Sequence, residues 1–209
     1  MPGTIGVLGG IFDPVHNGHL AVGALARDYF NLETLIYIPS GTPPHKISTV
    51  SAPSADRLEM LKIALQDDSD AVIWDCEALR PQVSYTIDTL EELSSAYPDR
   101  LMFFIVGADN LNEIHTWRRY RDILARVTLC VTGRPGYSME IPATLASAKI
   151  EKFPSPFWGV SSTLVREYIA RGFSCKHLLP DRVLEYISNN GLYRTGDHLK
   201  PVSAHRMNH

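Results

Sequence analysis

The chain has 209 residues, of which 44% are hydrophobic, and its formal net charge is −3 at pH 7. A chain of this length can bury a sizeable core, and one domain is the first expectation. The acidic balance argues against a broad basic face that binds nucleic acid through counterion release, so we expect no nucleic-acid partner.

The first residues and the cysteines are typical of a cytoplasmic protein. The first ten residues contain no Lys or Arg and their apolar run soon meets Asp13, so we expect neither a signal peptide nor a membrane span. Cys76, Cys130 and Cys175 are far apart in the sequence and form no C-x-x-C pair, which fits a reducing compartment. The sequence leaves open whether the protein forms a homo-oligomer.

Strand-like and helical segments alternate along the chain. The expected strands are 4–8, 34–38, 71–74, 101–106 and 127–132, and the expected helices are 18–30, 54–67, 85–96 and 161–171. This alternation predicts a Rossmann-like, doubly wound α/β fold with a parallel sheet and helices on both of its faces. We expect one domain over 1–194 and a polar tail over 195–209, whose irregularly spaced histidines are better explained as solvated than as metal ligands.

The segment after the first expected strand is suited to phosphate binding. It reads Gly9-Gly10-Ile11-Phe12-Asp13-Pro14-Val15-His16-Asn17-Gly18-His19. The two glycines let backbone approach a ligand, and a helix that begins at Asn17-Gly18 favours an anion at its N-terminus. His16 and His19 share one face of the first turn and can both direct donors at a phosphate. A glycine-rich turn with two surface histidines is the alternative, and the combined spacing argues against it.

These eleven residues resemble the signature of the class I nucleotidyltransferases, G-x-F-D-P-x-H-x-G-H, at every fixed position. The resemblance implies adenylyl or cytidylyl transfer, in which a phosphate attacks the α-phosphorus of a nucleoside triphosphate and pyrophosphate leaves. It also implies that both histidines are catalytic, and that ATP is bound by Gly9, Gly10, Phe12, His16, Gly18 and His19.

A second segment, Gly159-Val160-Ser161-Ser162-Thr163-Leu164-Val165-Arg166, is expected to begin a helix. Ser161 or Ser162 is a natural N-cap, which would be its whole role if the segment stood alone. Beside the first motif, the segment resembles the second signature of the same superfamily, I-S-S-T-x-x-R, with Val160 in place of Ile. The resemblance implies that Ser161, Ser162 and Thr163 bind the β- and γ-phosphates of ATP, and that Arg166 is a catalytic clamp on the polyphosphate.

Further segments resemble those of the nicotinate mononucleotide adenylyltransferases, and this resemblance covers most of residues 4–194. They are Pro43-Pro44-His45-Lys46, Ser84-Tyr85-Thr86-Ile87-Asp88-Thr89-Leu90, Gly107-Ala108-Asp109-Asn110-Leu111, Trp117-Arg118-Arg119-Tyr120 and Arg134-Pro135-Gly136-Tyr137. The resemblance implies that ATP donates AMP to nicotinate mononucleotide and that Mg²⁺ accompanies the ATP. Nicotinamide mononucleotide is the alternative acceptor.

The residues expected to bind the acceptor are Ser40, His45, Lys46, Tyr85, Thr86, Trp117 and Arg134. Tyr85 and Thr86 begin a helix whose free N–H groups favour the carboxylate of nicotinate, and Trp117 offers a face for stacking the pyridinium. Core packing is the alternative for Trp117, and a solvated loop residue is the alternative for Arg134. By resemblance, Lys46 also acts as a catalytic charge on the transferred phosphoryl group.

Gly107 and Asp109 are expected on the ATP side of the site. Asp109 follows an expected strand and suits the ribose hydroxyls, and its alternative role is to cap a short helix over Asn110–Ile114. No protein metal site is expected, because Mg²⁺ keeps several waters and binds largely through the phosphates.

Three rival functions agree less well with these residues. Phosphopantetheine as acceptor is disfavoured by Tyr85, Thr86 and Trp117. An aminoacyl-tRNA synthetase shares the H-x-G-H logic but needs a much longer chain. An NAD-binding oxidoreductase or nucleotide sensor would need G-x-G-x-x-G, which Gly6–Phe12 does not contain.

Overall fold

The computed structural model describes residues 3–41, 51–80, 82–154 and 159–194. In this part of the chain, six strands form one parallel sheet in the order β3-β2-β1-β4-β5-β6. The order reverses direction between β1 and β4, so a crevice for a ligand is expected outside the carboxyl ends of these two strands. The strands are β1 (Gly3–Gly10), β2 (Thr34–Pro39), β3 (Ala71–Ile73), β4 (Arg100–Gly107), β5 (Val127–Thr132) and β6 (Ile150–Phe153).

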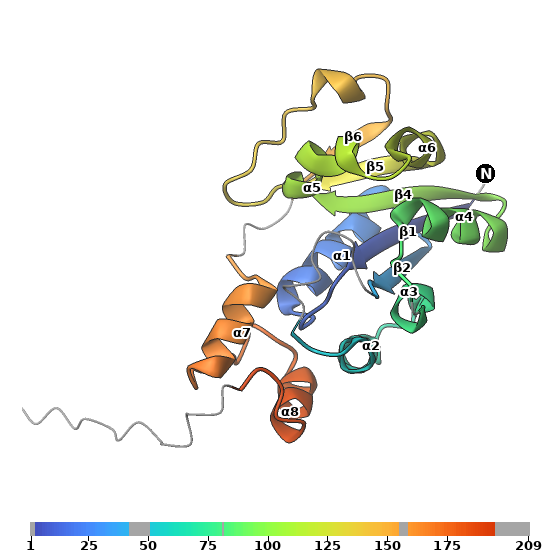
Figure 1. Ribbon diagram of the computed structural model, residues 1–209. Helices are drawn as coiled ribbons and strands as arrows, with labels where there is room; N and C mark the ends of the chain where they lie inside the picture. Colours follow the sequence, from blue (N-terminus) through green and yellow to red (C-terminus); the bar gives the residue numbers. More distant parts are fainter. Residues whose placement is uncertain (1–2, 42–50, 81, 155–158, 195–209) are drawn as a thin grey trace, which may run out of the picture.

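Helices cover both faces of the sheet, which confirms the predicted Rossmann-like fold (Figure 1). Figure 1 also shows α7 and α8 toward the same end of the molecule, and buried side chains of both belong to one hydrophobic core. None of the helices in the described ranges is long and apolar enough to span a membrane. The helices are α1 (Asn17–Phe30), α2 (Ser54–Leu65), α3 (Cys76–Leu79), α4 (Thr86–Ala96), α5 (Ala108–Glu113), α6 (Tyr120–Arg126), α7 (Ser162–Ala170) and α8 (Asp181–Asn189), with short 3₁₀ turns at Ile114–Thr116 and Ala143–Leu145.

The strands supply two hydrophobic cores, because successive side chains of a strand point to opposite faces of the sheet. Leu35 and Tyr37 of β2 pack into the core that includes side chains of α1, α2, α7 and α8. Ile36 and Ile38 of the same strand pack into the core that includes side chains of α4, α5 and α6. A strand buried on both faces reads as a continuous apolar run, which is why the sequence pattern located these strands.

The structure contains every expected strand and helix, with ends within two residues of the expected positions. The sequence pattern did not predict β6, α3, α6 and α8. β6 pairs with β5 alone, and its exposed Glu151 and Lys152 are typical of an edge strand and interrupt the apolar pattern. In α8, the buried Val183 and Ile187 lie four residues apart, so a helical period was available in the sequence.

Candidate active site

Two cavities open at the carboxyl ends of β1 and β4. The larger has a volume of about 660 Å³ and lies between the two signature motifs. The smaller has a volume of about 240 Å³ and lies against the first turn of α4. Gly9, Gly10 and Ile11 line both cavities, so the loop after β1 stands where the two cavities meet.

Both histidines of the first motif line the larger cavity. His16 is the N-cap residue of α1, and His19 lies in the first turn of that helix. Their rings stack with centroids 3.7 Å apart and planes inclined by 22°. The backbone N–H of His16 donates a hydrogen bond to Nδ1 of His19 at 3.2 Å. Because Nδ1 of His19 accepts this bond, the neutral ring carries its proton on Nε2.

Both imidazoles are neutral at pH 7. Burial lowers the pKa of His16 to about 4, and the positive charge of Arg134 acts in the same direction. Burial also lowers the pKa of His19 well below its usual value, with the charges of His16 and Arg134 adding to the effect. Each ring can therefore donate an N–H hydrogen bond to a phosphate oxygen while the ring itself carries no positive charge.

Phe12, in the loop that carries the first motif, packs against His19. The buried ring of Phe12 meets the His19 ring edge-on, with centroids 5.0 Å apart. Phe12 has a φ of +50°, a left-handed conformation that a bulky residue adopts only where its surroundings enforce it. A Cβ at Gly10 would lie 3.0 Å from the Phe12 ring, whereas a Cβ at Gly9 would meet nothing within 4 Å. Gly10 is therefore needed for packing, and Gly9 faces open space in the cavity.

Asp13, the acid of the first motif, holds the loop to distant parts of the chain. The residue is 1% exposed. The carboxylate accepts hydrogen bonds from the N–H groups of Ser51 at 2.7 Å and Ala52 at 3.0 Å. It also accepts from the Tyr193 hydroxyl at 2.8 Å, which links the loop to the segment after α8. With these bonds made, Asp13 supports the loop that carries the first motif.

The second motif lies against the first motif at the larger cavity. Ser161 is the N-cap residue of α7, and its hydroxyl accepts from the N–H of Leu164 at 3.2 Å. The Ser162 hydroxyl donates to the carbonyl of Pro14 at 3.0 Å. Arg166 Nη1 donates to the carbonyl of Asp13 at 2.7 Å, and Nη2 lies 3.4 Å from the Thr163 hydroxyl. Side chains of α7 therefore join the two motifs through backbone carbonyls of the first.

Asp109 and Arg134 form an ion pair in the wall of the larger cavity. Asp109 lies in the first turn of α5, and the N-cap residue of this helix is Gly107, so the alternative in which Asp109 caps the helix is wrong. Its Oδ2 pairs with Arg134, and its buried Oδ1 has no hydrogen-bond partner among the described residues. Arg134 was predicted with the acceptor residues, but the structure places it beside the ATP-side residue Asp109.

The described members of the predicted acceptor set line the smaller cavity, apart from Arg134. They are Ser40, Tyr85, Thr86 and Trp117. Tyr85 is the N-cap residue of α4, so the first N–H groups of this helix have no partner within it. Trp117 meets Phe104 edge-on at 6.2 Å and also lines the cavity, so it packs against the core and offers a surface for stacking. His45 and Lys46 lie outside the described residues.

The smaller cavity also has charged residues that the sequence analysis did not assign to it. The guanidinium of Arg118 lies 4.5 Å above the ring of Tyr85. The buried carboxyl of Glu77 accepts the Thr89 hydroxyl at 2.6 Å, and burial raises the pKa of Glu77. Arg118 directly follows Trp117 in the segment already singled out, so its position was an available signal. Glu77 lies on the four-residue helix α3, which is too short for a periodic pattern.

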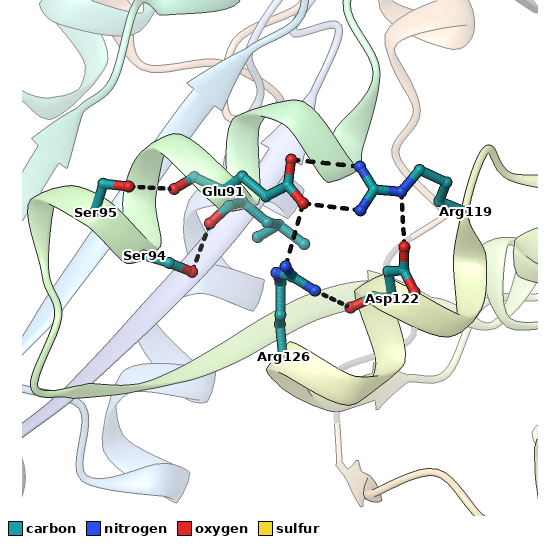
Figure 2. Close-up of polar contacts among 7 residues, drawn as sticks. Glu91, Ser94, Ser95, Arg119, Asp122 and Arg126 are labelled. Atoms are coloured by element: carbon teal, nitrogen blue, oxygen red, sulfur yellow. Dashed lines mark hydrogen bonds and ion pairs between the residues drawn. The ribbon is translucent and has the colours of Figure 1, made fainter.

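Ion pairs attach the Trp117 segment to α4 (Figure 2). Figure 2 shows the Glu91 carboxylate of α4 between the guanidinium groups of Arg119 and Arg126. Glu91 Oε1 lies 3.0 Å from Arg119 and 3.1 Å from Arg126, and Arg119 Nε also donates to Asp122 at 2.7 Å. Single exposed ion pairs stabilise proteins little, but here several charges share their partners. The network ties the residues that follow Trp117 to the helix whose first turn borders the smaller cavity.

Unpaired polar atoms are concentrated in the larger cavity. In the part of the chain that the structure describes, four buried side-chain polar atoms lack a hydrogen-bond partner, and three of them belong to residues that line this cavity. Buried polar atoms are nearly always paired, so such a group indicates that the cavity binds a polar ligand. The three atoms are His16 Nδ1, Asp109 Oδ1 and Thr132 Oγ1.

The fold and the site define a doubly wound α/β protein with a helix start that lines a cavity at its topological switch point and a second pocket beside it. Comparison with known proteins gives a match to the cytidylyltransferase-like family over residues 7–168, and the chain belongs to this family.

Curated relatives match along most of the chain. A probable nicotinate-nucleotide adenylyltransferase of Desulfitobacterium hafniense (strain Y51) is 40% identical over 200 residues, which cover 92% of this chain and 97% of the relative. One of Exiguobacterium sibiricum is 37% identical, and the match covers 91% of this chain and 99% of the relative.

Solved structures share the fold at low sequence identity. A Plasmodium falciparum nicotinic acid mononucleotide adenylyltransferase complexed with NaAD has a TM-score of 0.76 at 17% identity, with 91% of this chain and 97% of the other covered. A putative nicotinate-nucleotide adenylyltransferase from Vibrio parahaemolyticus has a TM-score of 0.66 at 20% identity, with 92% and 96% covered.

Proposed function

We propose that the protein transfers AMP from ATP to nicotinate mononucleotide, which forms nicotinate adenine dinucleotide and pyrophosphate. The observation that carries this proposal is the pair of cavities that meet at Gly9–Ile11. One is lined by phosphate-binding groups, and the other by the start of α4 and the Trp117 ring. The names of relatives that match over nine-tenths of the chain support the same reaction.

ATP occupies the larger cavity in this proposal. His16 and His19 donate N–H groups to the α- and β-phosphates, while the second motif and Arg166 receive the β- and γ-phosphates. The unpaired Oδ1 of Asp109 accepts from a ribose hydroxyl. Arg134, held by Asp109, adds positive charge on the nucleotide side of the site.

The acceptor occupies the smaller cavity. The first N–H groups of α4 receive the carboxylate of nicotinate, and Trp117 stacks on the pyridinium. Ser40 borders this ligand, and His45 and Lys46 are proposed from the sequence alone to hold its phosphate. Arg118, above the Tyr85 ring, supplies a cation at the same wall.

The reaction needs no covalent intermediate. The 5′-phosphate oxygen of the acceptor is already a nucleophile, so it attacks the α-phosphorus in line while the bond to the leaving pyrophosphate breaks. The work of the protein is to align the two substrates and to stabilise charge on the transferred and leaving groups. The place where the two cavities meet is where this alignment occurs.

Mg²⁺ is proposed to enter with ATP. The described residues contain no group of three or more His, Cys, Asp or Glu side chains that could hold a metal ion. Within the larger cavity, Asp13 is engaged by Ser51, Ala52 and Tyr193, which leaves the Oδ1 of Asp109 as an unpaired carboxylate oxygen. This donor set fits an ion held mainly by phosphates and water, which when bound neutralises charge on the triphosphate.

We also propose that the protein acts in the cytoplasm and that it binds no nucleic acid. The three cysteines are free thiols, and Cys130 and Cys175 are buried, which supports a reducing compartment. The net charge of −3 disfavours a nucleic-acid partner.

Pyrophosphate release from ATP tests the proposal directly. The purified protein is assayed with nicotinate mononucleotide, nicotinamide mononucleotide and phosphopantetheine side by side, with Mg²⁺ present and then removed by a chelator. We expect fastest release with nicotinate mononucleotide and loss of activity without Mg²⁺. Faster release with nicotinamide mononucleotide would favour the alternative acceptor, and no release with any of the three would refute adenylyl transfer to these acceptors.

A further inference from the structure

Arg57 is a fully buried arginine that the reaction described above does not use. It lies in the second turn of α2 and is 1% exposed. Among the described residues no carboxylate lies within ion-pair distance of its guanidinium. Burial lowers the pKa of Arg57, and the attraction of the Asp13 carboxylate offsets this only in part. A charge placed in this way is costly, so its contacts need an explanation.

Within the described part of the chain, every hydrogen bond of the Arg57 guanidinium goes to a backbone carbonyl of a loop. Nη1 donates to Ile11 at 2.6 Å and to Ser40 at 2.6 Å, and Nη2 donates to Gly41 at 2.9 Å. Nε donates to Ala52 at 3.3 Å. One planar group therefore holds the loop after β1, the loop after β2 and the segment that leads into α2 in fixed relative positions.

These loops form the place where the two cavities meet. Ile11 lines both cavities, and Ser40 lines the smaller one. The backbone N–H of Ser40 donates to the Gly10 carbonyl at 2.8 Å, so the two loops already run side by side. Ala52 is held twice, because its N–H donates to Asp13 and its carbonyl accepts from Arg57.

We propose that Arg57 is a positioning residue of the transfer reaction, which sets the distance between the two substrates by joining the loops after β1 and β2. This role rests on the proposed function. In-line transfer depends on the separation of the reacting atoms, and a misplacement of about 1 Å can cost 10²-fold in rate. Arg57 touches neither cavity itself, so its loss changes alignment more than substrate binding.

Kinetics of Arg57→Lys and Arg57→Gln, with Leu61→Ala as the control, test this role. Leu61 is a fully buried residue of the same helix that lines neither cavity, so its truncation weakens α2 without touching the loops. We measure the thermal unfolding midpoint and, below it, kcat and both KM values from pyrophosphate release. We expect kcat of both Arg57 variants to fall about 10²-fold with each KM within about threefold, while Leu61→Ala keeps kcat near wild type at a similar loss of thermal stability.

Each contrary outcome identifies what is wrong. A wild-type protein without activity would contradict the proposed function, and this role with it. An active wild type beside an Arg57→Lys variant of unchanged kcat would overturn the role of Arg57 alone. So would variants that fail to fold, or whose kcat falls only as much as that of Leu61→Ala, because either result assigns Arg57 to folding.

Discussion

Two neutral imidazoles form one wall of the larger cavity, and the proton on Nε2 makes His19 a ready donor to a phosphate oxygen. A donor of this kind acts most strongly on charge that develops in the transition state, because it is already oriented before the reaction begins.

His19→Ala should remove transition-state stabilisation. On the scale of one lost preorganised donor, we expect kcat to fall about 10²–10³-fold with both substrates saturating. His115→Ala is the matched control, because His115 is exposed and lines neither cavity. Near-normal turnover in His19→Ala, or an equal loss in His115→Ala, would contradict the catalytic role.

The buried histidines should make stability depend on pH. The folded-state pKa of His16 is about 4, against about 6.5 when unfolded, so the unfolded chain binds more protons between these values. Above about pH 6.5, His16 therefore causes no loss in the free energy of unfolding. As the pH falls toward 4, the protonation of His16 in the unfolded chain lowers this free energy by up to about 3 kcal/mol.

Denaturant unfolding of the wild type and His16→Gln at pH 7 and pH 5 measures this effect. We expect the free energy of unfolding to fall less between the two pH values in His16→Gln, because that side chain takes up no proton. Equal falls in the two proteins would show that His16 is not held neutral by the fold.

At the scale of elements, the start of α4 and the Trp117 segment make different contributions to acceptor binding. Charge-assisted hydrogen bonds to backbone N–H groups exceed neutral ones by roughly 1–2 kcal/mol each. Two such bonds favour nicotinate over nicotinamide mononucleotide, and the cost of desolvating the carboxylate offsets part of this gain. We expect a preference on the order of 10–10³-fold in kcat/KM. The ratio of the two kcat/KM values in the wild type checks this prediction.

Trp117→Ala serves as the control for that ratio. Stacking acts on the pyridinium that both mononucleotides share, so the variant should weaken both acceptors alike and leave the ratio nearly intact. A collapse of the ratio in Trp117→Ala would show that selectivity lies with the tryptophan, and a wild type that uses both acceptors equally would refute the anion site.

In the molecule as a whole, the C-terminal part of the chain is attached both to the loop of the first motif and to α2. Tyr193 donates its hydroxyl to Asp13 at 2.8 Å, and Tyr186 donates to Asp56 of α2 at 2.9 Å. The two bonds are chemically alike, but only Asp13 lies in the first motif. Removal of each bond in turn therefore distinguishes an effect on stability alone from an effect on catalysis.

Tyr193→Phe and Tyr186→Phe should each lower the free energy of unfolding by about 1.5–3 kcal/mol, the usual value of a hydrogen bond to a charged group. Only Tyr193→Phe should also lower kcat, because it loosens the loop that carries His16. Denaturant unfolding and steady-state kinetics on both variants measure these two effects. Equal kcat values in the two variants would show that Tyr193 does not support the active site.

Patterns among neighbouring residues were enough to predict most of the fold and much of the site. The apolar runs of β1, β2, β4 and β5 and the spacing of His16 and His19 depend on residues close in the sequence, where the periods of strand and helix operate. The same holds for the helix starts at Ser161 and Tyr85. These elements were therefore predicted within two residues of their observed ends.

Tertiary structure alone decided the supporting contacts. Arg57 and Arg166 donate to backbone carbonyls, and Asp13 accepts from backbone N–H groups. Every residue has a carbonyl and nearly every residue an N–H, so such a partner leaves no mark in the sequence. The sequence by itself determined which residues of the two motifs line the larger cavity, while only the folded chain, by bringing distant loops together, determined how Arg57 holds them and why Arg134 lies beside Asp109.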